Sequence, residues 1–225
     1  MKRFLPFVII ALVALLTTVI AVTAYHAKTR VAAAPAAGDA ASPTPADAPE
    51  DPSLHVRGPR NAAVTLEIYG DFQCPSCAVV SQGIDELQKQ HEGNMRVVFR
   101  EFPLDMHKHA MEAALAAEAS AVQGKFWEMH DKLYQNQSVW SEATTVGFLF
   151  DSYAESIGLD VARFRADRNA PDVRLRVRED MKTGDSRGIK STPTVFVNGM
   201  QLRAGFTKDE LQKTIDAALA QKKTS

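Results

Sequence analysis

The stretch "AVTLEIYGDFQCPSCAVV", residues 63–80, predicts a strand, a short turn and the start of a helix. Residues 63–71 are rich in the β-branched and aromatic side chains that strands prefer. Pro75 suits the first position of a helix, because its missing N–H costs nothing there. Cys74 therefore lies at the predicted helix N-terminus. The apolar residues that follow recur at the helical spacings of three and four: Cys77, Val80, Ile84 and Leu87.

A second strand is predicted at residues 95–102, "MRVVFREF". A strand, a helix and a strand joined by short connections form a βαβ unit, so we expect these strands to be parallel with a right-handed crossover. Helical periodicity then continues over a long block, at residues 106–123, 126–134, 146–157, 160–169 and 172–187.

The last part of the chain returns to β structure. Asn198-Gly199 separates residues 192–197 from residues 200–205, and this dipeptide between two apolar runs is the strongest short signal for a β-hairpin. Thr207 and Glu210 form a capping box that opens a final helix. The complete order is β-α-β, a helical block and β-β-α.

Cys74 and Cys77 are the only cysteines in the chain. A structural zinc site needs about four Cys or His ligands, and the nearby candidates are the histidines of "HKH" at 107–109. A structural disulfide across two residues would remove little entropy from the unfolded chain. A redox pair fits better, because unpaired N–H groups and the helix dipole stabilise a Cys74 thiolate and lower its pKa below about 8.5.

Such a thiolate has two chemical consequences. It is a good leaving group, and its stability raises the reduction potential, so the disulfide is readily donated to another protein. Cys77, one turn further along the apolar face, is expected to be more buried than Cys74 and to act as the resolving thiol.

The motifs occur in an order that resembles the DsbA-like thiol:disulfide oxidoreductases. The resemblance rests on "DFQCPSC" after a strand, "FREFPL" at 99–104 with His107 and Ala110, "GKFWEMHDKLY" at 124–134 and "TP" opening the late hairpin. It implies an α/β, thioredoxin-like fold over residues 56–225, with a helical insertion at about 104–190. The N-terminal membrane helix before this domain is predicted from hydropathy.

Site residues follow from the same resemblance. Cys74 matches the cysteine that forms a mixed disulfide with substrates, and Cys77 matches its partner in the redox disulfide. Pro75 and Ser76 lie between them and tune the potential. Pro193 matches a cis-proline facing the cysteines, with Thr192 before it, where the backbone of an extended substrate pairs. From the residues alone, a trans Pro193 at the start of an edge strand is equally open. No metal or other cofactor is predicted.

One position departs from the family pattern. Relatives commonly carry a buried acid six residues before the first cysteine, and this chain has Ile68 there. Glu67 lies one residue earlier, and the two-residue period of a strand points it to the opposite face unless a bulge intervenes. We therefore assign no catalytic role to Glu67.

Three histidines and a basic run have simpler interpretations than catalysis. His107 and His109 are interpreted as surface residues near a helix start, and His130 as a hydrogen-bonded packing residue. Residues 163–190 contain nine Arg or Lys and five acids, which is typical of a solvated helix face with internal ion pairs.

The N-terminal segment, residues 1–24, carries two cations and then 21 residues without charge, enough to cross a bilayer core. It predicts an anchor in the cytoplasmic membrane, with everything after it on the extracytoplasmic, periplasmic side. The alternative is a signal segment cleaved after Ala24, which would release the protein from the membrane. Residues 25–55 are rich in Ala and Pro and predict a linker.

These inferences predict an extracytoplasmic thiol:disulfide oxidoreductase that donates the Cys74–Cys77 disulfide to cysteine-containing exported proteins. The resemblance implies reoxidation by a membrane partner of the DsbB or vitamin K epoxide reductase-like type. A formal charge of −1 gives no general attraction to nucleic acid. Three alternatives stay open: a reductase or isomerase kept reduced by a membrane electron donor, a Cu(I)-binding chaperone, and a holdase that needs neither cysteine.

Overall fold

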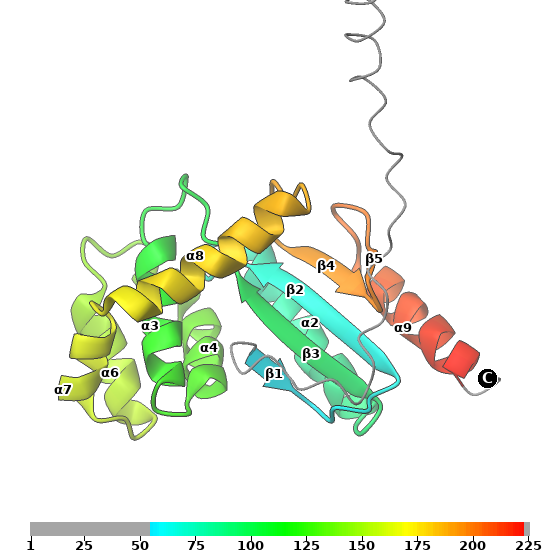
Figure 1. The fold of residues 1–225 in the computed structure, drawn as a ribbon, viewed down its shortest axis with the longest axis horizontal. Coiled ribbons are helices and arrows are strands. Elements are labelled where there is room, and N and C mark those ends of the chain that lie inside the picture. Colours follow the sequence, from blue (N-terminus) through cyan, green and yellow to red (C-terminus); the bar gives the residue numbers. More distant parts are fainter. Residues whose placement is uncertain (1–54, 223–225) are drawn as a thin grey trace, which may run out of the picture. The chain divides into compact units, whose positions relative to one another are not determined.

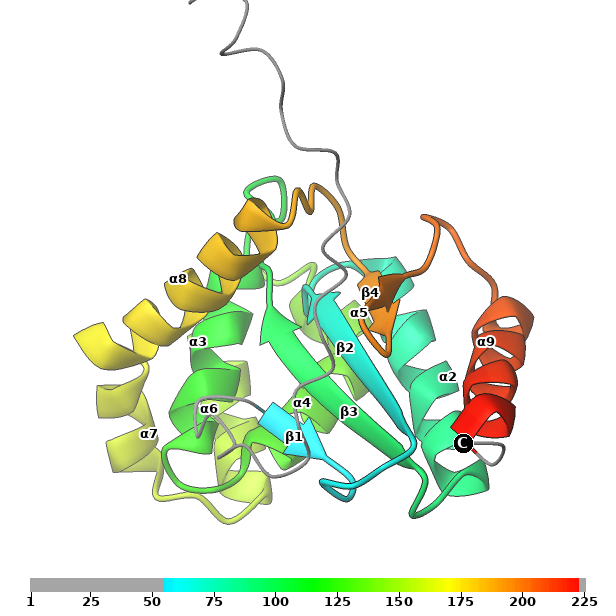
Figure 2. The ribbon, with the colours of Figure 1, turned by 45° about the vertical axis from the view of Figure 1, so that its right-hand side comes forward.

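The computed structural model describes residues 55–222, which form a mixed sheet with helices on both faces (Figure 1). The strands lie in the order β1-β3-β2-β4-β5 and comprise β1 (His55–Arg57), β2 (Val64–Gly70), β3 (Met95–Glu101), β4 (Thr194–Val197) and β5 (Met200–Gln201). The helices are α2 (Pro75–Gln90), α3 (Ala110–Ala121), α4 (Phe126–Gln135), α5 (Gln137–Trp140), α6 (Gly147–Ser156), α7 (Val161–Asp167), α8 (Pro171–Ser186) and α9 (Lys208–Lys222). Helices α2 and α9 lie side by side, and α8 crosses the opposite face of the sheet (Figure 2).

The predicted βαβ unit is confirmed. Strands β2 and β3 are parallel, with Ile68 opposite Phe99, and α2 connects them. Strand β4 pairs antiparallel with the other edge of β2. The predicted turn joins β4 to β5, with φ values of 49° at Asn198 and 83° at Gly199. Strand β2 is therefore central, and the chain leaves it directly before the two cysteines.

Alternate residues of β2 and β3 face opposite layers, as the strand period requires. Ile68 and Phe99 belong to the main hydrophobic core together with residues of α2 and α4. Glu67 and Arg100 face α8 on the other side, where Arg100 donates to Asp180 at 2.9 Å. The two faces of one strand therefore carry different chemistry, apolar towards the cysteines and charged towards α8.

The predicted helical block lies between β3 and β4. Helix α3 is rich in buried alanines and contacts α4, α6, α7 and α8, so it forms the centre of this block. The short helix α5 was not predicted. Its Trp140 is fully buried and donates from Nε1 to the carbonyl of Leu133 at 2.7 Å. This contact holds α5 against α4.

Two predicted elements have different bounds in the structure. The helix predicted at 106–123 begins only at Ala110, after turns that bring His107 against Asp71. The strand predicted at 200–205 is only two residues long, and both residues of β5 are exposed. The capping box of the last helix is confirmed, since the Thr207 amide donates to the Glu210 carboxylate at 2.7 Å.

Strand β1 has no signal in the local sequence pattern. It pairs antiparallel with β3, and side chains hold it as well. The His55 ring stacks on Phe126 at 3.5 Å between centroids, and its Nε2 lies 2.8 Å from the Glu118 carboxylate. Arg57 donates to Asp85 at 3.0 Å and to Asp131 at 2.9 Å. These contacts fasten the start of the described chain to α2, α3 and α4.

The anchor predicted within residues 1–24 lies outside the described residues, as does the predicted linker except for His55, where β1 begins. Within residues 55–222, we find no helix with both the length and the apolar character needed to cross a membrane.

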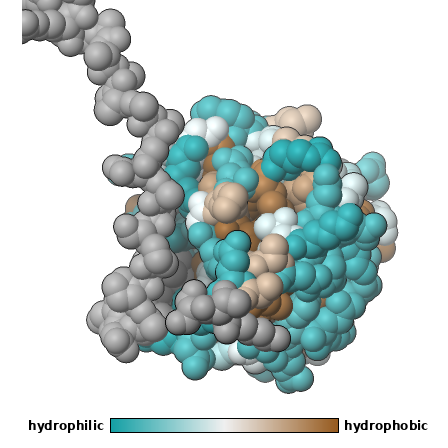
Figure 3. Space-filling model, turned by 90° about the vertical axis from the view of Figure 1, so that its right-hand side faces the viewer, coloured by the Kyte–Doolittle hydropathy of each residue, from teal (hydrophilic) through white to brown (hydrophobic). Residues whose placement is uncertain are grey.

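The side of the molecule that carries β5 and α9 is shown in Figure 3. Hydrophobic residues gather there in a hollow that hydrophilic residues surround. Leu202 and Phe206, in the connection to α9, pack partly buried against the main core, while Met200 is 72% exposed. This side therefore presents apolar surface to solvent.

Candidate active site

The two cysteines lie where β2 ends and α2 begins. Cys74 is the N-cap residue, with an extended backbone, and Pro75 occupies the first helical position. The Cys77 amide donates to the Cys74 carbonyl at 3.1 Å and closes the first turn. Both side chains are free thiols, with Cys77 3% and Cys74 7% exposed. The predicted placement of Cys74 at the helix N-terminus is confirmed, and Cys77 is the more buried of the two.

The loop before β4 faces these thiols. The Thr192–Pro193 peptide bond is cis, as the resemblance implies, and Pro193 lines the same cavity as Cys77. When Cys74 is protonated, its thiol donates to the Thr192 carbonyl at 3.4 Å. The Thr192 hydroxyl oxygen is buried and has no hydrogen-bond partner among the described residues. That hydroxyl is therefore available to donate to a thiolate at Cys74.

The surroundings of Cys74 favour its thiolate strongly. A hydrogen bond from the Cys77 thiol is the main reason that the pKa of Cys74 falls from the usual 9.0 to about 5, against the opposing effect of burial. The backbone N–H groups of Cys77 and Ser76 and the Thr192 hydroxyl lower this pKa further. The N–H groups are those of the helix start on which the prediction from sequence relied. The thiol of Cys77, which that prediction did not consider, contributes more than either N–H group alone.

The pKa of Cys77 moves in the opposite direction. Burial raises it well above 9.0, and donation to Cys74, as well as the negative charge there, raises it further. At neutral pH the reduced pair therefore holds one thiolate, at Cys74, and one proton, on Cys77. This asymmetry separates an attacking sulfur from a resolving sulfur.

Asp71 orders the loops around the cysteine turn. Its side chain is buried, and one carboxylate oxygen accepts the Gln73 amide at 2.7 Å. The other oxygen accepts the Leu104 amide at 2.9 Å and lies 2.7 Å from Nδ1 of His107. Asp71 was not singled out from the sequence, although an Asp that ends a strand before a turn is a signal for this kind of local hydrogen bond. His107 supports Asp71 and has no contact with the thiols.

Two glutamines hold the cysteine turn from outside. Gln137 in α5 donates from Nε2 to the carbonyls of Phe72 at 2.6 Å and Cys74 at 3.0 Å. Gln73 accepts the amide of His109 at 2.6 Å and donates to the carbonyl of Ser141 at 3.2 Å. The helical block therefore positions the turn. No local sequence signal identifies these partners, because they lie 36 to 68 residues away along the chain.

The interpretation of His109 as a surface residue was wrong. Its side chain is only 2% exposed, with Nδ1 2.8 Å from Glu112 and Nε2 2.8 Å from the Ala143 carbonyl. His109 is buried because the chain turns inward before α3 begins. The interpretation of His130 as a packing residue is confirmed, since it is buried and its Nδ1 lies 2.8 Å from Asp131. Five rings surround it: Phe72, Phe99, Phe126, Trp127 and Tyr134.

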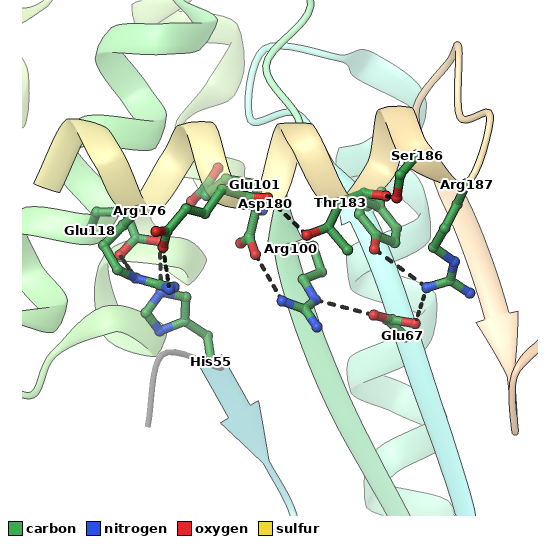
Figure 4. A network of polar contacts seen from close by, with 12 residues as sticks. His55, Glu67, Arg100, Glu101, Glu118, Arg176, Asp180, Thr183, Ser186 and Arg187 are labelled. Carbon is green, nitrogen blue, oxygen red and sulfur yellow. Dashed lines mark hydrogen bonds and ion pairs between the residues drawn. The ribbon is translucent and has the colours of Figure 1, made fainter. Parts of the chain in front are cut away.

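Glu67 points away from the cysteines, as the strand period predicts. It lies between Arg100 and Arg187 beneath α8 (Figure 4), and Arg100 donates to it at 3.1 Å. Ile68, at the position where relatives carry an acid, lines the cavity beside Cys77. Strand β2 therefore offers Cys77 no carboxylate.

A second buried acid lies at the end of β3. Glu101 is fully buried, and neither carboxylate oxygen has a hydrogen-bond partner among the described residues. Burial raises its pKa well above 4.5, and the negative charges of Glu118 and Asp180 raise it further. Figure 4 shows Glu101 near these two acids and Arg176. Burial and the neighbouring negative charges therefore favour the protonated form of Glu101.

Comparison with known proteins agrees with this geometry. A family model described as thioredoxin matches residues 50–217. The chain belongs to the thioredoxin family. The solved structure of oxidised BdbD from Bacillus subtilis is similar, with a TM-score of 0.68 and 26% identity over 76% of this chain and 96% of that chain. The thiol-disulfide exchange protein alpha-DsbA2 from Wolbachia pipientis shares the fold, with a TM-score of 0.64 and 18% identity over 74% of this chain and 88% of that one. The predicted resemblance to DsbA-like proteins, and with it the thioredoxin-like fold, is confirmed.

Curated relatives carry a different name. The chain is 41% identical over 177 residues to "Na(+)/H(+) antiporter NhaA 1" of Salinispora arenicola, covering 76% of this chain and 26% of that protein. The chain therefore spans about a quarter of the length of the curated relatives it matches.

Proposed function

We propose that this protein is an extracytoplasmic thiol:disulfide oxidoreductase that donates the Cys74–Cys77 disulfide to cysteine-containing exported proteins. The family and fold support disulfide exchange in general. The observation that carries the direction of transfer is the pKa of about 5 at Cys74. A thiolate that is stable at neutral pH stabilises the reduced enzyme, so the oxidised enzyme gives up its disulfide readily.

The exchange proceeds in two displacements. A substrate thiolate attacks Cys74 of the disulfide, a mixed disulfide forms, and Cys77 leaves and takes up a proton. A second substrate thiolate then attacks the substrate sulfur of the mixed disulfide and releases Cys74 as a stable thiolate. The substrate gains a disulfide and loses two electrons, which the enzyme keeps as a reduced pair.

Thr192 and Pro193 are proposed to bind the substrate chain beside Cys74. Pro75 and Ser76 are exposed between the cysteines, so a partner protein reaches this turn without rearrangement. Val79, one turn further along α2, is 70% exposed. An exposed apolar residue one turn from Pro75 and Ser76 suits exported chains that have not yet buried their own apolar segments.

The location and the redox partner rest on the sequence before residue 55. An apolar segment at 4–24 followed by a linker supports a tether that holds the domain outside the cytoplasmic membrane. A membrane oxidase of the DsbB or vitamin K epoxide reductase-like type is then the proposed source of new disulfides. The match to the antiporters covers about a quarter of their length, so their transport activity is not carried over to this chain.

The reduction potential of the full chain tests this proposal. The protein is equilibrated in glutathione buffers of defined ratio, and the two redox forms are separated by thiol alkylation and mass. A potential near about −120 mV supports disulfide donation, because disulfide donors lie at that end of the scale. A potential near about −270 mV overturns it and favours a reductase. A Cys74→Ser variant provides the baseline for alkylation of Cys77 alone.

A further inference from the structure

A small cavity lies against one side of α2, beside Cys77. Its lining includes Cys77 and Pro193, and also Arg57, Asp85 and Gln88. These last three residues also line a wider hollow at the surface. The cavity beside Cys77 and this surface hollow therefore share three residues, and Asp85 lines both.

The size of the cavity fits water. The centre of a water molecule has about 20 Å³ in which to move, and a site needs roughly 10–15 Å³ of such volume to hold one water. An organic ligand needs far more space. Ser81 and His130 interrupt the otherwise mainly apolar walls, so water there has polar groups to bind.

Three residues of α2 share the cavity wall at a spacing of four. Cys77, Ser81 and Asp85 lie at i, i+4 and i+8, which puts them on one side of the helix. The rise of α2 separates Cys77 from Asp85 by roughly 12 Å along the axis, so any proton transfer between them needs water. Among the described residues that line the cavity, Asp85 is the one carboxylate.

The groups around Asp85 keep it ready to exchange protons. Arg57 of β1 donates to Asp85 at 3.0 Å, while Asp131 and His130 of α4 and Lys89 of α2 also act on it electrostatically. Burial, together with the negative charge of Asp131, raises the pKa of Asp85 above 3.8 despite the cations. Its side chain is 37% exposed, so it exchanges protons with bulk water directly.

The buried thiol of Cys77 needs a route for its proton. Cys77 must release a proton each time it attacks Cys74 and regain one each time it leaves. Ile68 stands where relatives carry an acid, and Glu67 faces α8. The described part of β2 therefore provides no proton acceptor.

We propose that water in this cavity carries the proton of Cys77 to and from Asp85, which is a positioning residue for that proton. The inference rests on the proposed disulfide exchange and adds a residue to it. It assigns to α2 the function that an acid in the preceding strand serves in relatives.

The proposed step is balanced for protons and electrons. During reoxidation, Cys74 attacks the disulfide of an oxidised partner, and a mixed disulfide and a partner thiolate form. Cys77 then gives its proton through the water to Asp85 and attacks the Cys74 sulfur. The internal disulfide forms, the second partner thiolate leaves, and two electrons have passed to the partner. Asp85 returns its proton to solvent through the outer hollow.

Two variants and one matched control separate this path from general effects on the fold. Asp85→Asn removes the proton acceptor and leaves an oxygen for Arg57. Ser81→Leu fills the path with carbon atoms and leaves Asp85 in place. Glu86→Gln removes a neighbouring negative charge of α2 that is paired with Lys208 at the surface and does not line the cavity. It is expected to behave as the wild type.

The test follows the resolution of a mixed disulfide with glutathione. Reduced full-length protein is mixed with glutathione disulfide, quenched with acid at set times and analysed by mass. The rate at which Cys77 displaces glutathione from Cys74 is measured across pH. We expect Asp85→Asn and Ser81→Leu to slow this step by about tenfold to a hundredfold at neutral pH. This range is at or below the smallest rate effects of general bases, because here the proton passes through water before it reaches the base. In both variants the rate should rise in proportion to hydroxide.

Two results would overturn the inference in different ways. If Asp85→Asn resolves the mixed disulfide at the rate and with the pH profile of Glu86→Gln, the cavity path is wrong and the proposed function stands. If the wild type forms no glutathione adduct at Cys74, or Cys77 never resolves it, the disulfide exchange itself is wrong. The pKa of Cys74, measured in each variant, should stay at the wild-type value if the change is confined to the proton of Cys77.

Discussion

Replacing Cys77 by alanine is expected to raise the pKa of Cys74 from about 5 to about 6, whereas Cys77→Ser should keep it near 5. The hydrogen bond from the Cys77 thiol makes the largest contribution to the low pKa of Cys74. Alanine removes that donor, while serine offers an O–H in nearly the same place. The two variants therefore differ in one hydrogen bond to the thiolate.

The size of the effect follows from the strength of such a bond. A hydrogen bond to a charged group contributes about 1.5–3 kcal/mol, and one pKa unit corresponds to about 1.4 kcal/mol. The loss would therefore raise the pKa by about one to two units. Because Cys74 lies next to exposed residues, water replaces part of the lost donation, and we expect about one unit. The remaining N–H groups and the Thr192 hydroxyl keep the pKa below its usual value.

The ultraviolet absorbance of the thiolate, followed against pH, measures this shift. Each variant has a single cysteine, so the signal belongs to Cys74 alone. Alkylation rates measured over the same pH range provide an independent value. Equal values of the pKa in Cys77→Ala and Cys77→Ser would refute the reasoning, because the low pKa would then come from the helix N-terminus without help from Cys77.

Further predictions concern groups on both sides of the sheet. Thr192→Val should raise the pKa of Cys74 by less than one unit, because the Thr192 hydroxyl lowers this pKa less than the Cys77 thiol does. The same absorbance titration measures the change. In the reduced protein, the lowered pKa of Cys74 adds stability at high pH that is lost as pH falls through about 5. The free energy of unfolding in urea should therefore exceed that of Cys74→Ser by less at pH 4 than at pH 8. Glu67→Gln should lower the free energy of unfolding by about 1–2 kcal/mol, a value between those of surface and of buried ion pairs. It should leave the rate of disulfide exchange unchanged. The pKa of Glu101 is raised in the folded protein, so the stability that its protonated form contributes is complete below pH 4.5 and is lost as the pH rises. The free energy of unfolding of Glu101→Gln should therefore increase relative to that of the wild type with increasing pH. A difference between the two proteins that does not change with pH would contradict this.

Local sequence patterns predict the elements whose causes are local. Pro75 and the apolar spacing after it predict α2 because both act within a few turns of one helix. Asn198-Gly199 predicts its turn because only a few residue types adopt positive φ easily. These signals place Cys74 correctly at a helix start, although they give no information about what lies opposite its sulfur.

The rest of the site depends on contacts between distant parts of the chain. Thr192 is 118 residues from Cys74, and Gln137 is 63 residues away, so no periodicity connects them. Thr192 was identified through a family resemblance, whereas Gln137 was missed. His109 was interpreted as a surface residue near a helix start, and its burial depends on the turn before α3. Strand β1 was missed because three residues are too few for a pattern.

The strand and helix periods together explain why the proton path is proposed in α2. A period of two turns Glu67 towards α8 and Ile68 towards the cysteines, so this strand cannot place its acid beside Cys77 without a bulge. A period near 3.6 puts Asp85 two turns beyond Cys77 on the same side of the helix. The N-terminus of α2 stabilises the thiolate that attacks, and the side of the same helix faces the cavity that Cys77, the resolving thiol, lines. One helix would thereby control the charge of both sulfurs, so a substitution at Ser81 or Asp85 should change the resolution rate without changing the pKa of Cys74.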